Sequence, residues 1–225
     1  MSLEIEGDLE AASAYYAQPR PDLVALVRGT GLRVLEVGCA SGAVGAELKR
    51  QGKAAVVHGV ESHGAVASLA EARLDRVWRA DVETLDPAEL EPPYHALVAG
   101  DVLEHLRDPW SFLRRISQVL AAGAEIVVSV PNIRYLPVVA DLVVRGRFDY
   151  RCQGVLDRTH LRFFTRRSVH HLLSGSGFVD VQISQTELSR PWMRRTARML
   201  GDLGVRQFVA RARLPGEGAS DEPPP

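Results

Sequence analysis

Short valine-rich apolar runs alternate with segments of helical period along most of this 225-residue chain. Five such runs predict strands at about 33–37, 55–60, 76–80, 95–99 and 124–130. Strands that alternate with helices are typical of a parallel sheet covered by helices on both faces. The length and the 46% hydrophobic content support one large core, so we expect a single α/β domain.

Helix boundaries follow from capping residues. Asp108 before a proline predicts the start of a helix that Gly123 closes. Thr165 predicts the start of another helix, which ends at Gly175 or Gly177. These signals place helices between the predicted strands.

The carboxyl half adds two segments, 178–185 and 207–214, in which apolar and polar residues alternate as in half-exposed strands. Together with the first five strands they predict a Rossmann-like three-layer α/β/α sandwich. Its seven-stranded, mostly parallel sheet is finished by an antiparallel last strand at the edge. The segment 190–205 between them has one apolar helical face, which fits an acceptor lid, a dimer contact or a membrane-surface element.

Composition excludes several classes of protein. Cys39 and Cys152 stand far apart without a CxxC pair, so neither a disulfide framework nor a zinc knuckle is indicated. No signal peptide or apolar run of about 18 residues is present, so we expect a cytoplasmic protein without stable membrane insertion. The residues 131–214 include fifteen Arg and only six acids, so this part of the chain is positively charged. The last residues, 216–225, have a composition typical of disorder.

The stretch "EVGCASG" after the first predicted strand leaves the backbone bare at Gly38, Ala40 and Gly42. The amides of the following helix can then bind the negative end of a ligand. A dinucleotide is the usual ligand of such a turn, but the GxGxxG spacing fails in both frames, and no GK[ST] follows. The stretch therefore matches neither the dinucleotide pattern nor the Walker pattern.

"EVGCASG" resembles motif I of the class I S-adenosylmethionine-dependent methyltransferases, with Ala40 in place of the middle glycine. An alanine permits close backbone approach while its φ is negative. Three further pieces of the family pattern follow in order at strand ends: "VHGVES", "WRADVE" and "LVAGDVLEHLRDP". The resemblance implies S-adenosylmethionine as cofactor and S-adenosylhomocysteine as product.

The same resemblance implies a set of cofactor contacts. A carboxylate at Glu61 can accept both ribose hydroxyls, and Asp81 can accept the adenine amino group. Val82 and Leu103 are expected to sandwich the adenine, and Arg20 to pair with the methionine carboxylate. The expected contacts are Glu36, Gly38, Ala40, Gly42, Glu61, Ser62, Asp81, Val82, Gly100, Asp101, Leu103, Tyr16 and Arg20.

Structural interpretations of the same acids remain open. Asp81 could be a helix N-cap, and Asp101 with Glu104 matches a capping box. Against the box, Pro109 starts the predicted helix eight residues later, so the box would cap almost nothing.

The carboxyl half, with "THLRFFT" before a helix and "GSGF" leading into a strand, resembles the subgroup of ubiquinone-biosynthesis O-methyltransferases and MetW-like proteins. Methyl transfer to a hydroxyl needs alignment and a base of near-neutral pKa. The candidates are His105 and His160, with Asp157 as an orienting partner of His160 or as part of a structural loop clasp. No metal-ligand cluster is visible in the sequence.

Aromatic residues and arginines interleave across 133–163. That mixture can bind nucleic acid, but a pI near 6.7 and the lack of a recognition motif favour a pocket for an anionic or aromatic small molecule. We therefore expect one methyltransferase domain over 1–215, with N-terminal lid helices in 1–30 and acceptor-side insertions at 131–165 and 187–205. The expected enzyme is a monomer or homodimer that methylates an oxygen, or a nitrogen, of a small molecule. A nucleotide-dependent oxidoreductase and a non-catalytic MetW-like partner protein are the alternatives.

Overall fold

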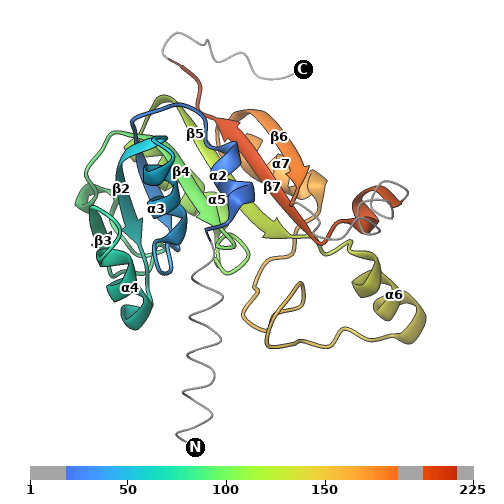
Figure 1. Ribbon diagram of the computed structural model, residues 1–225. Helices are drawn as coiled ribbons and strands as arrows, with labels where there is room; N and C mark the ends of the chain where they lie inside the picture. The colour runs from blue at the N-terminus through green and yellow to red at the C-terminus, as the bar shows by residue number, and fades with distance from the viewer. Residues whose placement is uncertain (1–18, 187–199, 217–225) are drawn as a thin grey trace, which may run out of the picture.

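A computed structural model describes the protein over residues 19–186 and 200–216. Seven strands form one sheet in the order β3-β2-β1-β4-β5-β7-β6 (Figure 1). The strands are β1 (Leu32–Val37), β2 (Ala54–Val60), β3 (Arg76–Trp78), β4 (Tyr94–Gly100), β5 (Leu120–Pro131), β6 (Val179–Gln185) and β7 (Gln207–Arg213). Each predicted strand is present, and its bounds lie close to those expected from the apolar runs.

The pairing of the strands brings the carboxyl ends of β1, β2 and β4 together along one edge of the sheet, which lies across the strand direction. Strands β1, β2, β3, β4 and β5 are parallel neighbours, and Val37 at the end of β1 pairs with Val60 of β2 and Ala99 of β4. The residues that follow β1, β2 and β4 therefore lie next to one another, at the place where ligands bind in open α/β sheets.

The last strand is antiparallel, as expected, but it is not the outermost strand of the sheet. Strand β7 pairs antiparallel with both β5 and β6, so β6 is the outermost strand and runs parallel to β5. Both faces of β7 are covered, since Phe208 and Ala210 are buried in one core of the sheet and Val209 in the other. Strand β6, by contrast, has mostly exposed or half-buried residues.

Helices cover both faces of the sheet. Those described are α2 (Pro21–Leu26), α3 (Ala43–Arg50), α4 (Gly64–Glu71), α5 (Pro109–Ile116), α6 (Leu136–Arg145) and α7 (Arg166–Ser174), with short 3-10 turns η1 (Pro87–Glu89), η2 (Ser117–Val119) and η3 (Gly201–Gly204). Apolar residues of α2, α3 and α4 pack on one face, and those of α5 and α7 on the other. The result is the three-layer sandwich that the alternating pattern predicts.

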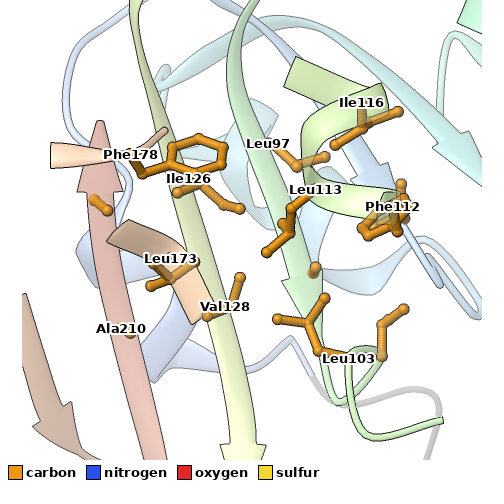
Figure 2. Packing of buried hydrophobic residues seen from close by; sticks show 14 of the residues in the cluster. Leu97, Leu103, Phe112, Leu113, Ile116, Ile126, Val128, Leu173, Phe178 and Ala210 are labelled. Atoms are coloured by element: carbon orange, nitrogen blue, oxygen red, sulfur yellow. The ribbon is translucent and has the colours of Figure 1, made fainter. Parts of the chain in front are cut away.

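The two cores follow the two-residue period of the strands. In β4, Leu97 belongs to the core under α5 and α7, whereas its neighbour Val98 belongs to the core under α2 and α3. Figure 2 shows the first of these cores, where Phe112 and Leu113 of α5 and Phe178 before β6 pack around Leu97. Both layers are fixed by apolar burial, which gives the sheet edge a rigid support.

The helix expected to end at Gly123 is shorter than predicted. Helix α5 ends at Ile116, the turn η2 follows, and β5 already begins at Leu120, which pairs with Tyr94 of β4. Gly123 has φ +77 and lies inside the strand rather than closing the helix. Pairing with β4 therefore outweighs the helical propensity of the alanines in this segment.

The predicted helix starts are confirmed. The Asp108 side chain accepts a hydrogen bond from the amide of Ser111, and Thr165 forms a reciprocal capping box with Ser168. Among the residues that the structure describes, no helix has the length and apolar character needed to span a bilayer.

Helix α6 and the loop that follows it extend away from the sheet (Figure 1). The helix has no buried residue, and the exposed fractions of Leu142, Val143 and Val144 are 47%, 76% and 79%. The insertion after β5 is therefore an arm outside the two cores.

Candidate functional site

The turn between β1 and α3 places bare backbone at the carboxyl end of β1. Gly38 and Gly42 have φ values of +62° and +74°, in the left-handed region that favours glycine. A Cβ atom on Gly38 would lie 2.5 Å from Cγ2 of Val102, so only glycine lets the turns after β1 and β4 meet. Ala40 also has a positive φ, +47°, so the condition of a negative φ is not met and the residue is held in a strained conformation.

Glu61 directly follows β2 and faces this turn. One of its carboxylate oxygens accepts a hydrogen bond from the amide of Ala40 at 3.0 Å, and the other accepts one from the amide of His63 at 2.8 Å. Each oxygen keeps a lone pair, so the carboxylate can still accept hydroxyl donors from a ligand. Glu61 thus joins the turn after β1 to the end of β2.

Asp81 lies one strand further along the same edge. The amide of Ala80 donates to the carbonyl of Glu61 at 3.1 Å, which holds the end of β3 beside the end of β2. The Asp81 carboxylate accepts from the amide of Glu83 at 2.9 Å and is exposed. It caps a turn rather than a helix, and its second oxygen has no protein donor among the described residues. Ser62, the other polar residue at this edge, is exposed.

Glu36 lies beneath the turn. Its side chain is 4% exposed and accepts a hydrogen bond from the amide of Gly45, at 2.9 Å, near the start of α3. Burial, opposed by this hydrogen bond and assisted by the charge of Glu61, raises the pKa of Glu36 to about 8. At neutral pH this carboxyl group is therefore mostly protonated, and a ligand cation placed beside it would favour its ionised form.

Asp101 stands at the centre of a network after β4. Its side chain pairs with Arg20 at 2.6 Å and accepts hydrogen bonds from Ser129, at 2.8 Å, and from Gln207. This Asp101 network joins the segment before α2 to β5 and β7. It also holds Asp101 at a φ of +56°.

The capping-box interpretation of Asp101 is wrong. No helix begins there, because α5 begins at Pro109, and the carboxylate is already occupied by Arg20. Arg20 also pairs with Asp22 at 3.0 Å, so both of its neighbours are acids of this chain. A ligand carboxylate would have to replace one of them to reach the guanidinium.

Of the two residues expected to sandwich the adenine, only one is accessible to a ligand. Leu103 is fully buried within the core that Figure 2 shows, so it presents no surface to a ligand. Val82 is half-buried and stays available. At Gly100 the side chain of Leu23 closes in, because a Cβ there would lie 2.7 Å from its Cδ1.

Two histidines far apart in the sequence meet beside this edge. The rings of His105 and His160 lie 4.8 Å apart, centroid to centroid, in an edge-to-face arrangement. Nδ1 of His105 bonds to the carbonyl of Thr159 at 3.2 Å, and Nδ1 of His160 bonds to the carbonyl of Val155 at 3.1 Å. A carbonyl only accepts, so each Nδ1 donates its proton, and Nε2 is the ring nitrogen left to accept one.

The charge state of the first ring is set by its surroundings. Burial and the neighbouring His160 lower the pKa of His105, so the ring is neutral at pH 7. The Asp157 carboxylate binds the amide and hydroxyl of Thr159, at 2.8 and 2.6 Å, rather than the ring of His160. The orienting contact of His160 is therefore the carbonyl of Val155, and Asp157 forms the loop clasp.

Sequence reasoning missed Glu104 as a candidate site residue. Its side chain is 1% exposed, one of its oxygens has no hydrogen-bond partner, and burial raises its pKa well above the ordinary value. Glu104, His105 and His160 offer ligand atoms within 4.8 Å of one another, a set that could hold a metal ion. The adjacent "EH" in the sequence is the only signal of it, because the third member comes from 55 residues further along the chain.

Several aromatic and arginine residues of 133–163 form local contacts. Phe148 contacts Tyr150 and Phe163 in a ring cluster. Arg145 pairs with Asp141 on α6 itself. A pocket for an anionic or aromatic small molecule in this segment stays a prediction.

Two expected elements fall outside the described residues. These are Tyr16, in the predicted lid, and most of the amphipathic segment 190–205.

The residues at the sheet edge fit S-adenosylmethionine. Two carboxylates with free lone pairs, at Glu61 and Asp81, match the hydroxyls and amino group of an adenosine. Gly38 and Gly42 bring no side chains to the turn after β1, and the buried acid Glu36 lies beneath that turn. This set of hydrogen-bond acceptors suits an adenosine.

The comparisons with known proteins agree with this assignment. A family model described as a methyltransferase domain matches residues 9–183, which is most of the chain. The chain therefore belongs to the methyltransferase domain family and is of the class I S-adenosylmethionine-dependent type. The oxidoreductase alternative is thereby set aside.

Within that class, the chain resembles ubiquinone biosynthesis O-methyltransferases. The protein of that name from Caulobacter sp. (strain K31) is 30% identical over 105 residues, covering 45% of this chain and 42% of the relative. The one from Bradyrhizobium diazoefficiens is 33% identical over 108 residues, covering 45% of this chain and 41% of the relative. Each match spans less than half of the curated relative.

Solved structures show the same fold at low identity. A SAM-dependent methyltransferase from Archaeoglobus fulgidus has a TM-score of 0.61 and 19% identity, covering 90% of this chain and 94% of that one. One from Mesorhizobium loti has a TM-score of 0.60 and 18% identity, covering 86% and 96%. A Haemonchus contortus phosphoethanolamine N-methyltransferase 2, in complex with S-adenosyl-L-methionine, has a TM-score of 0.56 and 13% identity, covering 87% and 52%.

Proposed function

We propose that this protein transfers a methyl group from S-adenosylmethionine to an oxygen of a small molecule, within one methyltransferase domain over 1–215. The observation that carries the choice of oxygen is the histidine pair. His105 and His160 each keep Nε2 free to accept a proton, and a hydroxyl acceptor must lose one. The curated relatives, which bear the name O-methyltransferase, support the same choice.

The cofactor, when bound, supplies a methyl group already activated by the positive charge of its sulfonium. The chain's own residues have three tasks. Glu61 and Asp81 hold the adenosine end by hydrogen bonds, and Glu36 receives the ammonium. The Asp101 network fixes the segment before α2 over the edge of the sheet.

Proton removal is assigned to the histidine pair. His105 follows β4 by five residues, so it stands at the edge that binds the cofactor. Because its pKa is lowered, the ring accepts a proton at neutral pH without first losing one. His160 lies against it and can share the transferred proton.

Binding of S-adenosylhomocysteine, measured by isothermal titration, tests the cofactor assignment. Glu61→Ala and Asp81→Ala are each expected to weaken the affinity by about 1–3 kcal/mol, because each removes a hydrogen-bonding carboxylate. Glu89→Ala, at an exposed position of η1, is the matched control. Unchanged affinity in both site variants would refute the proposed adenosine site.

Turnover tests the reaction itself. Formation of S-adenosylhomocysteine is measured with small phenols, alcohols and amines as acceptors, and a phenolic or alcoholic acceptor is expected to react. A protein that binds the cofactor product but methylates no acceptor would instead support the non-catalytic MetW-like alternative. Faster reaction with amines would contradict the choice of oxygen.

A further inference from the structure

A second concave site lies away from the cofactor edge, between α7, the edge strand β6 and the turn η3. Its volume is about 440 Å³, within the range of pockets that hold small molecules. It is lined by Arg134, Thr165, Arg166, Arg167, His170, Val181, Ile183 and Asp202. The strand order places β6 three strands beyond β4, so this pocket does not belong to the adenosine site.

A buried asparagine builds the frame of the pocket. Asn132 is completely buried, and its side-chain amide donates to the carbonyls of Asp202 and Val205, both at 2.7 Å. Its side-chain oxygen accepts a hydrogen bond from the amide of Arg134 at 2.9 Å. Asn132 therefore fixes the backbone at two opposite parts of the lining, on the segment after β5 and on η3.

Arg166 forms a fixed wall. Its guanidinium pairs with Asp202 at 2.8 Å, donates to the carbonyl of Ile183 at 2.6 Å and lies 4.9 Å from the centre of the Phe208 ring. These contacts immobilise the side chain and neutralise the one acid of the lining. The half-buried Val181 and Ile183 add an apolar surface beside it.

The other cations of the lining are not neutralised. Among residues 19–186 and 200–216, no acid pairs with Arg134 or Arg167. The only side-chain partner of Arg167 there is the ring of His171, at 3.2 Å. Three guanidinium groups and one carboxylate give the pocket an excess of two positive charges. An ordinary solvated face has neither the buried frame nor the apolar wall, so this excess charge points to a ligand.

We propose that this pocket binds a phosphate group carried by the methyl acceptor. A phosphate monoester is close to a dianion at neutral pH, which matches the excess charge, and arginine binds its oxygens in a bidentate manner. The apolar wall receives the carbon skeleton next to the phosphate. This inference rests on the proposed function, because it names a feature of the acceptor.

The chain also limits how far the phosphate lies from the reacting hydroxyl. Thr165 lines the pocket, and His160 of the histidine pair precedes it by five residues. Five residues of extended chain span at most about 18 Å. One acceptor molecule of moderate length can therefore occupy both places.

The test is isothermal titration of the protein saturated with S-adenosylhomocysteine, using phenyl phosphate, benzoate and inorganic phosphate as probes. Phenyl phosphate is expected to bind more tightly than the other two. Arg134→Gln and Arg167→Gln are each expected to weaken its binding at least about tenfold, since each removes a charged hydrogen bond. Arg79→Gln, an exposed arginine after β3 at the opposite edge of the sheet, is the matched control and is expected to change nothing.

Two results would overturn the proposal. Equal binding of phenyl phosphate to the control and both pocket variants would show that the pocket is not the site. Equal binding of inorganic phosphate and phenyl phosphate would show a site for free phosphate rather than for an acceptor. Because Arg134 and Arg167 are exposed, their variants are expected to fold. Unchanged affinity of each variant for S-adenosylhomocysteine would verify that it has folded. If the unmodified protein does not bind S-adenosylhomocysteine, the proposed function is refuted, and this result is separate from the test of the pocket.

Discussion

Glu36→Gln is expected to make the protein more stable than the wild type at pH 8 and nearly equal to it at pH 5. The Glu36 carboxyl group has a pKa of about 8 in the folded chain, mainly because it is buried, against 4.5 ordinarily. Between these two values the folded state binds more protons than the unfolded state, so stability falls as the pH rises. The Gln side chain resembles the protonated acid and does not titrate.

The magnitude follows from the two pKa values. The wild type is expected to lose roughly 3–4 kcal/mol of unfolding free energy between pH 5 and pH 8 through Glu36 alone. The assay is urea unfolding followed by tryptophan fluorescence at pH 5, 6, 7 and 8 and constant ionic strength. Glu89→Gln, on an exposed turn, is the control and should follow the wild type. Parallel stability curves for wild type and Glu36→Gln would refute the reasoning, because the buried carboxyl group would then not be the titrating one.

Three further predictions concern the turn, the histidine pair and metal dependence. Ala40→Gly is expected to stabilise the protein by about 1 kcal/mol in the same unfolding assay, because glycine adopts the positive φ of this position without strain; a loss of stability would contradict that view. His160→Ala is expected to lower kcat by at least about 100-fold without changing the affinity for S-adenosylhomocysteine, as expected for a lost base. Treatment with a chelator is expected to leave wild-type turnover unchanged. Activity that disappears with the chelator and returns with added Zn²⁺ would show that Glu104, His105 and His160 bind a metal ion rather than act as a metal-free base.

The sheet and its helices could be predicted largely from local patterns. Valine-rich runs locate strands because a parallel strand covered on both sides has few polar residues, and side chains such as Asp108 and Thr165 mark helix starts by a local hydrogen bond. The end of α5 could not be predicted in this way. It depends on the pairing of Leu120 with Tyr94, which are distant in the sequence.

The candidate site, too, could be predicted only where local patterns determine it. Gly38, Glu61 and Asp81 could be expected together because each follows a parallel strand, and such ends share one edge of a sheet. The contact of His105 with His160 depends on the path of an irregular segment, which no periodicity specifies. The role of Asn132 was equally hidden, since a lone asparagine after a strand looks like an ordinary turn residue.

The order of the strands separates two tasks along the sheet. The proposed cofactor contacts follow β1, β2, β3 and β4, whereas the phosphate pocket is built on β6, α7 and the segment after β5. The Asp101 network crosses between the halves through Ser129 and Gln207, and His105 adds a second link through its bond to the carbonyl of Thr159. For protein engineering, this arrangement makes the second half a replaceable module. Acceptor preference can be redesigned there by exchanging pocket residues, provided that Ser129 and Gln207 are retained, without disturbing the methyl donor.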